Sequence, residues 1–112
     1  MKKIEAIIKP YKLDEVRDAL GEMGVTGMTV TEVRGVGRQQ GHAEIIYGME
    51  EESGFLPKLR LEMVVSDRIA DAAVATVVRS ARTGKIGDGK VFIAAVDQAV
   101  RIRTEETGDA AI

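Results

Sequence analysis

The sequence predicts an α+β fold of the ferredoxin-like class, βαββαβ, in which an antiparallel sheet carries two helices on one face. Three observations support this. The periodic segments run in the order strand, helix, strand, strand, helix, strand. The chain has 112 residues, 45% of them apolar, which suits one domain with a modest core. A long segment without periodicity separates the second strand from the third. We therefore expect a single domain over residues 1–112.

The first half of the fold follows from residues 3–36. Apolar and charged side chains alternate from Lys3 to Lys9, which predicts a strand that Pro10 ends because proline cannot donate to a sheet. Apolar side chains then recur every three or four residues from Leu13 to Met23, which is typical of a helix. Residues 27–36 are rich in Thr and Val and predict the second strand.

The second half follows from residues 58–103. Residues 58–66 alternate most cleanly and predict the third strand. Ser66-Asp67 is a good helix start, and the apolar stripe after it predicts a helix that ends near Ala81. The nearly continuous apolar run Val91–Val96 predicts another strand, and Val100–Arg103 a short extra one. The acidic tail, residues 104–112, is expected to be mobile.

In this plan the sheet face away from the helices carries Ile7, Thr29, Glu62 and Val64. This mixture is too apolar for bare solvent and too polar for a core. Two interpretations stay open at this point: an ordinary half-exposed sheet face, or a subunit interface or ligand cleft.

The segment Gly37–Leu56 has no clear period, and unstructured loops of that length in compact domains are usually functional or disordered. It carries apolar side chains, among them Tyr47, Met49 and Phe55, next to the acidic run Glu50–Glu52. The pattern predicts a segment that docks a partner. A poorly paired β-hairpin extension is the alternative.

The strongest local signal is Gly84–Lys90, which matches G-x-x-x-x-G-K. Glycines bring backbone N–H groups close to an anion, and lysines add charge. Val91 stands where a nucleotide-hydrolysing P-loop has Ser or Thr, and a strand follows in place of a helix, so we do not expect that activity. A plain glycine turn is the alternative. Arg101 and Arg103 favour an anion site, because two residues apart on a strand they would point the same way.

The amino-acid composition excludes further classes of protein function. The net charge of −2, with only two Phe and two Tyr, gives no basis for nucleic-acid binding. The chain has no cysteine and a single histidine, His42, so neither a thiolate metal site nor a nucleophilic dyad is expected. The charged N-terminus is no signal peptide, and no segment has the length to cross a membrane. We expect a cytoplasmic protein that is not an enzyme.

The whole chain resembles the PII signal-transduction proteins, a family of bacterial nitrogen regulators. The resemblance is carried by five segments that together are long and specific: Met1–Leu13, Gly27–Val33, Gly35–Gln39, Thr83–Lys90 and Arg101–Thr104. In the terms of that family, residues 37–56 are the T-loop, residues 82–90 the B-loop and residues 104–112 the C-terminal tail.

The resemblance implies a homotrimer in which ATP and ADP compete for three clefts between neighbouring subunits. The nucleotide-binding residues that it implies are Ile7, Thr29, Gly35, Gly37, Arg38, Glu62, Val64, Gly87, Asp88, Gly89, Lys90, Arg101 and Arg103. Arg101 and Arg103 would come from the subunit next to the one that supplies Gly87–Lys90. Beside Mg²⁺-ATP the family binds 2-oxoglutarate, here through Gln39, Lys58, Gly37 and Gly41, with Gln39 also ligating Mg²⁺.

Departures from the family pattern lie in the T-loop. Glu51 stands at the position of the tyrosine that is uridylylated in well-known members, Met49 at that of a phosphorylated serine, and Tyr47 at that of an arginine that plugs an ammonium channel. We predict no uridylylation at Glu51, which has no hydroxyl. The partner docked by this loop is expected to be a transporter or an enzyme of nitrogen metabolism, and a transporter would recruit the chain to the inner membrane. A paralogue that senses adenylates for a different transporter is the alternative.

Overall fold

The computed structural model describes residues 1–36 and 55–112. Its elements are β1 (Lys2–Ile8), η1 (Pro10–Lys12), α1 (Leu13–Glu22), β2 (Thr29–Gly35), β3 (Leu56–Val65), α2 (Asp67–Ala81), β4 (Lys90–Ala95) and η2 (Gly108–Ala111). The four main strands and both helices lie where the sequence predicts them, and β3 begins two residues earlier than expected.

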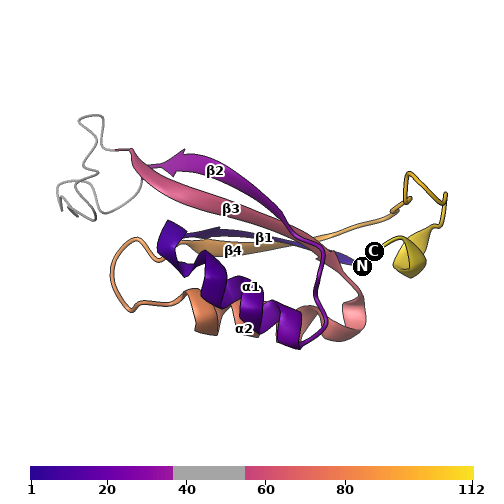
Figure 1. Cartoon of the computed structure of the whole chain (residues 1–112), viewed down its shortest axis with the longest axis horizontal. Coiled ribbons are helices and arrows are strands. Elements are labelled where there is room, and N and C mark those ends of the chain that lie inside the picture. Colours follow the sequence, from indigo (N-terminus) through magenta and orange to yellow (C-terminus); the bar gives the residue numbers. More distant parts are fainter. Residues whose placement is uncertain (37–54) are drawn as a thin grey trace.

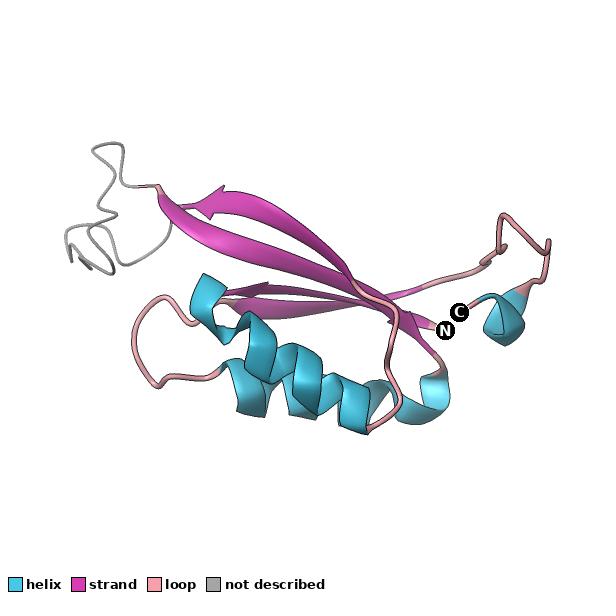
Figure 2. Ribbon diagram, viewed as in Figure 1, coloured by secondary structure: helices cyan, strands magenta, loops and turns pink. Residues whose placement is uncertain are grey.

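The strands form one sheet in the order β2-β3-β1-β4, and every neighbouring pair is antiparallel. Helices α1 and α2 lie side by side on one face of this sheet (Figures 1 and 2). The predicted α+β ferredoxin-like arrangement is confirmed. None of the described helices has the length and apolar character of a membrane span.

The hydrophobic core lies between the helices and the sheet. Its largest fully buried side chains come from β1, β3 and both helices, and they are Ile4, Ile8, Leu61, Val16, Leu20 and Val77. Each side chain of this size stabilises the fold by about 1.5–3 kcal/mol when it is removed from water. The apolar residues that recur at helical spacing in α1 and α2 and those that alternate in the strands therefore pack together in one core layer.

The other sheet face carries the mixed set that the sequence predicts. In the strand register, Thr29 lies opposite Glu62 on β3, and Val64 and Ile7 follow at even spacing on the same face. All of them except Thr29 are half-buried even in the isolated chain. Neither α1 nor α2 covers this face (Figure 2).

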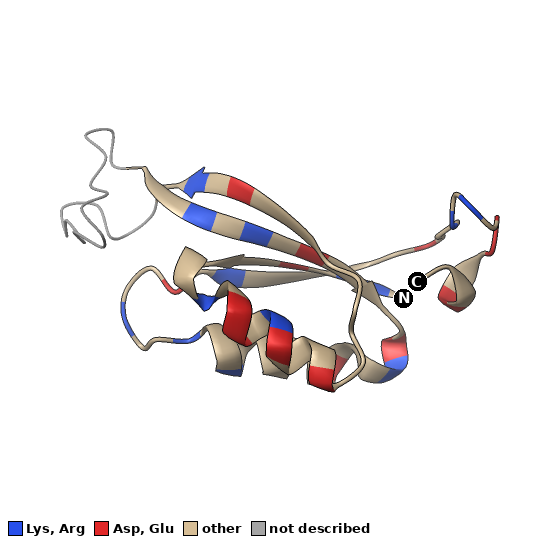
Figure 3. Ribbon diagram, viewed as in Figure 1, with Lys and Arg blue, Asp and Glu red and all other residues tan. Residues whose placement is uncertain are grey.

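A ladder of opposite charges crosses the uncovered face. Glu62 lies between Lys3, whose Nζ is 3.1 Å from it, and Arg60, whose Nε is 3.0 Å from it. Arg60 also approaches Glu5 at 3.6 Å. The hydrogen bond from Lys3 lowers the pKa of Glu62 against the opposing effect of its partial burial, and the charges of Lys3 and Arg60 add to that lowering. Figure 3 shows residues of both signs of charge on the strands of the sheet.

The predicted short strand at Val100–Arg103 is wrong. Val100 forms an isolated bridge with Thr107, the Arg101 N–H donates to the Glu106 carbonyl at 2.8 Å, and the residues between them make a turn. We call residues 99–108 the C-terminal hairpin. At its tip Ile102 is 97% exposed. The tail that follows the hairpin contains the 3-10 helix η2.

Candidate functional site

The glycine-rich loop, residues 82–89, connects α2 to β4. Three of its glycines have left-handed backbone angles, with φ of +84° at Gly84, +94° at Gly87 and +95° at Gly89. Side chains with a Cβ rarely adopt these angles, so the loop takes a course that only glycine permits without strain. Glycine-rich turns can bring backbone N–H groups close to an anion. In this loop the N–H groups of Thr83, Gly84 and Lys85 donate to side chains of the loop itself.

Gly89 also seats the loop on the sheet. A Cβ at this position would lie 1.7 Å from the Ile7 carbonyl oxygen and 2.8 Å from its carbonyl carbon. Both atoms belong to the backbone of β1, which is paired on both sides and cannot yield. The absence of a side chain at Gly89 thus fixes how closely the loop approaches β1.

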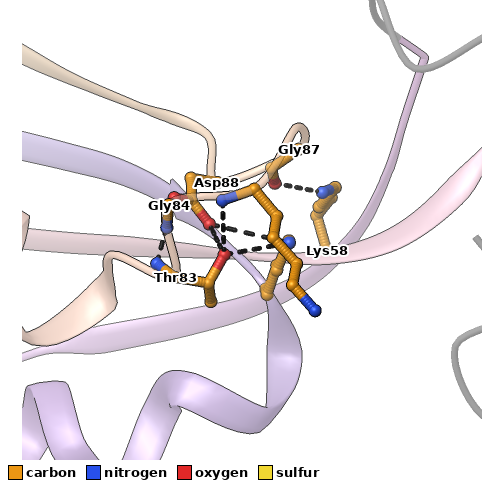
Figure 4. Close-up of polar contacts among 7 residues, drawn as sticks. Lys58, Thr83, Gly84, Gly87 and Asp88 are labelled. Carbon is orange, nitrogen blue, oxygen red and sulfur yellow. Dashed lines mark hydrogen bonds and ion pairs between the residues drawn. The ribbon is translucent and has the colours of Figure 1, made fainter.

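Asp88 holds the loop together from inside. Its carboxylate accepts hydrogen bonds from the Gly84 N–H at 2.8 Å, from the Thr83 N–H at 3.0 Å and from the Thr83 hydroxyl (Figure 4). The resemblance predicted Asp88 as a nucleotide contact. In the structure this carboxylate is turned toward its own loop, where it ties the start of the loop to its end.

Lys9, which directly follows β1, completes this arrangement. Its side chain is only 2% exposed, and its ammonium lies 3.2 Å from the Thr83 hydroxyl oxygen and 3.6 Å from the Asp88 carboxylate. Burial opposes the charge of Asp88, but the hydrogen bonds from Thr83 and Gly84 and the positive charge of Lys9 lower its pKa below the ordinary value. The loop therefore carries a paired, ionised carboxylate at neutral pH.

Lys58 reaches the loop from β3. Its buried ammonium donates to the Gly87 carbonyl at 2.5 Å (Figure 4), and its stem passes within 3.5 Å of the position that a Cβ on Gly35 would take. The end of the sheet beside the loop thus brings together several predicted site residues. They are Ile7, Gly35, Lys58, Gly87, Asp88, Gly89 and Lys90.

A second set of predicted residues lies around a groove of about 1070 Å³. Thr29 comes from β2, Glu62 and Val64 come from β3, and Arg101 comes from the C-terminal hairpin. Polar and apolar groups thus line the groove together. An apolar wall with a few polar groups is the usual form of a site for a small organic ligand.

The two sets of predicted residues lie at opposite ends of the folded molecule. Figure 1 shows the glycine-rich loop, in orange, at one end of the sheet and the C-terminal hairpin, in yellow, beyond the other. Arg101 and Arg103 are therefore far from Gly87–Lys90 within one chain. Because Arg101 directly precedes a turn and Arg103 lies within it, the prediction that they share one face of a strand is wrong as well.

Several predicted positions lie outside the described residues. They are Gly37, Arg38, Gln39, Gly41, Tyr47, Met49 and Glu51, together with His42. Over residues 1–36 and 55–112, no group of three His, Cys, Asp or Glu side chains is placed to hold a metal ion.

Sequence reasoning missed the part that Lys9 and Thr83 play. Lys9 reads as the last charged residue of an alternating strand, and nothing in its local pattern indicates burial. Thr83 directly precedes the glycine motif, and Asp88 follows it five positions later. A hydroxyl and a carboxylate at this spacing were a usable signal that the loop closes on itself. The contact of Gly89 with β1 needs the sheet order and could not be read from the sequence.

Comparison with known proteins assigns the family. Residues 1–106 match the protein family described as nitrogen regulatory protein P-II. The chain is 61% identical to the nitrogen regulatory protein P-II of Klebsiella oxytoca and to the nitrogen regulatory protein P-II 1 of Escherichia coli (strain K12), over 112 residues that cover all of each chain. It is 55% identical to the nitrogen regulatory protein P-II of Rhodobacter capsulatus, again over the full length of both chains. The chain therefore belongs to the nitrogen regulatory protein P-II family.

Proposed function

We propose that this chain binds ATP or ADP in clefts between the subunits of a homotrimer and passes the nucleotide state to a partner protein through its T-loop. Membership of the family makes the chain a signal transducer in nitrogen regulation and not an enzyme. Nucleotide binding, trimer formation and docking of a partner go beyond that assignment and are the content of the proposal.

The observation that carries the proposal is the separation of two half-sites. One half is the glycine-rich loop with Lys90, whose N–H groups and cation suit phosphates. The other half is the groove at Thr29, Glu62 and Val64, whose mixed wall suits a base and ribose. A single chain holds them at opposite ends, so a nucleotide that uses both halves needs two copies.

The uncovered sheet face is a suitable surface for that assembly. It is half apolar, carries the charge ladder at Glu62, and has no helix against it. Beside it, the side chains of Phe92 and Ile93 on the edge strand β4 are about half exposed. Closed cyclic assembly of three copies would place the loop of each subunit beside the C-terminal hairpin of a neighbour.

We also propose that 2-oxoglutarate binds beside the nucleotide with Mg²⁺. The family resemblance assigns Lys58 to a carboxylate of this ligand, and the position of its ammonium against the glycine-rich loop at Gly87 supports that assignment. Gln39, the expected Mg²⁺ ligand, lies outside the described residues. When bound, Mg²⁺ would supply charge neutralisation for the phosphates.

The regulated partner is proposed to be a transporter or an enzyme of nitrogen metabolism, reached in the cytoplasm or at the inner membrane. A ligand can move the T-loop only by binding one loop state more tightly than the other. The changed loop positions Tyr47, Met49 and Glu51 favour a second candidate, an adenylate sensor for a different transporter that works without uridylylation.

Calorimetry tests the sensing proposal. ATP, ADP and AMP would each be titrated with Mg²⁺, in the presence and absence of 2-oxoglutarate. Heat with ATP and ADP, and tighter ATP binding with 2-oxoglutarate, is expected. No heat with any nucleotide would remove the sensing function, and nucleotide binding without the 2-oxoglutarate effect would favour the second candidate. Sedimentation should give three times the 12.1 kDa of one chain.

A mixing experiment tests whether the site is shared. One variant, Lys90→Ala, damages the loop half, and another, Arg103→Ala, damages the hairpin half. Neither should bind ADP well alone. If they are unfolded together and refolded as mixed trimers, random assembly pairs two intact halves at about one quarter of the sites, so that fraction of ADP binding should return. No recovery would contradict a cleft shared between subunits.

A further inference from the structure

The buried side chain of Lys9 and the half-buried side chains of Thr83 and Asp88 form a closed frame at the glycine-rich loop. The Thr83 hydroxyl donates to Asp88 and accepts from the Lys9 ammonium at 3.2 Å and from the Lys85 N–H at 3.1 Å. Asp88 in turn accepts from the Gly84 N–H at 2.8 Å. One hydroxyl and one carboxylate thereby connect β1 to both ends of the loop (Figure 4).

We propose that Lys9, Thr83 and Asp88 are positioning residues for phosphate binding, which hold the loop N–H groups in the binding geometry without touching the ligand. This inference rests on the proposed nucleotide function. It assigns a role to Lys9 and Thr83, and it changes the expected role of Asp88 from ligand contact to internal brace.

The orientation of the carboxylate supports this assignment. A carboxylate that faced the phosphates would repel them, because like charges at short range are unfavourable. Here the Asp88 carboxylate accepts hydrogen bonds from two backbone N–H groups and a hydroxyl of its own loop, and it lies beside the Lys9 ammonium. Its negative charge is balanced within the frame, so it does not need to face the phosphates.

The burial of Lys9 supports it as well. An ammonium that is 2% exposed is costly to bury and is retained only with good partners. Its partners are residues of the loop, which follows it by more than seventy positions. The cation therefore fixes the loop to the end of β1 through Thr83 and Asp88, in addition to the contact that Gly89 makes with Ile7. A loop held at two points loses less conformational freedom when it binds a ligand.

The matched pair Thr83→Val and Thr83→Ser tests the frame. Valine keeps the shape of threonine but removes the hydroxyl, whereas serine keeps the hydroxyl. Calorimetry at a temperature well below the melting point should give about a tenfold loss of ADP affinity for Thr83→Val, equivalent to about 1.4 kcal/mol, and near-parent affinity for Thr83→Ser. Affinities for ADP that are equal in the two variants would overturn the inference.

A second readout separates positioning from simple stability. Asp88→Asn and Lys9→Met should both weaken ADP binding, and the double variant should lose less than the two single losses combined, because both act through one frame. Variants that melt earlier but bind ADP normally in the folded state would reduce the frame to a structural role and overturn the inference. If the parent chain itself binds no ADP, the proposed function fails first, and the two failures are thus distinguishable.

Discussion

Replacing Gly89 with alanine is expected to lift the glycine-rich loop away from β1. The new Cβ would lie 1.7 Å from the Ile7 carbonyl oxygen, whereas real Cβ contacts essentially never fall below 3.0 Å, so at least 1.3 Å of movement is required. The φ of +95° at Gly89 adds a strain of about 1–2 kcal/mol for a residue with a Cβ. Loss of the neighbouring β1–β4 hydrogen bonding at Lys90 would cost about 1 kcal/mol more.

The expected loss of unfolding free energy for Gly89→Ala is therefore about 2–3 kcal/mol. Because a displacement of about 1 Å can cost roughly a hundredfold in a positioned site, ADP affinity should fall by about that factor. Denaturant unfolding and calorimetry with ADP measure the two effects separately.

Gly84→Ala is the matched control for this change. Gly84 lies in the same loop with a φ of +84°, but a Cβ there would meet nothing within 4 Å. It should share the backbone strain of about 1–2 kcal/mol and lose much less ADP affinity. If both variants lose ADP affinity equally, or if Gly89→Ala binds within about threefold of the parent, the steric argument is refuted.

Three further predictions concern the rest of the fold. The pKa of Glu62 is lowered mainly by the hydrogen bond from Lys3, so Glu62 stabilises the fold above its ordinary pKa of 4.5, and this contribution is lost as the pH falls through the lowered value. Glu62→Gln should flatten the acid side of the stability curve, and an unchanged curve would contradict the pairing. The N-terminal amine of Met1 lies 3.0 Å from the Asp67 carboxylate and lowers its pKa, so acetylation of the amine should raise that pKa in an NMR titration, whereas an unchanged titration would exclude the contact in solution. Leu61→Ala, at a fully buried position, should cost about 2–5 kcal/mol in denaturant unfolding, and a loss under 1 kcal/mol would place Leu61 outside the core.

The main elements could be predicted because each has its own local period. The alternation in residues 58–66 and the three-to-four spacing in residues 13–23 each require one buried face, and one core satisfies both. The segment Val100–Arg103 alternates in the same way, yet it finds no neighbouring strand and turns back on itself through Arg101 and Glu106. Alternation indicates a strand only where a partner exists, and the sequence does not supply the partner.

The site could be predicted in part for a related reason. The glycines and lysines of residues 84–90 indicate an anion site by their composition alone. The family resemblance adds Thr29 and Val64 to the predicted site residues. The direction of the Asp88 carboxylate and the burial of Lys9 depend on β1 and the loop meeting in space. Contacts between residues so far apart in sequence leave no local pattern to read.

The contact between Lys9 and Thr83 joins positions that are 74 residues apart, and this has a consequence for biosynthesis. A nascent chain that leaves the ribosome carries Lys9 and Ile7 long before residues 82–89 are made. β4 is the last of the four strands in the sequence and pairs with β1 at the edge of the sheet, so the glycine-rich loop can take its shape only after β4 has been made. Long-range closure of this kind is slow compared with helix formation. Incomplete chains, which still lack the loop, should therefore bind no nucleotide, and binding would begin only in molecules whose sheet is finished.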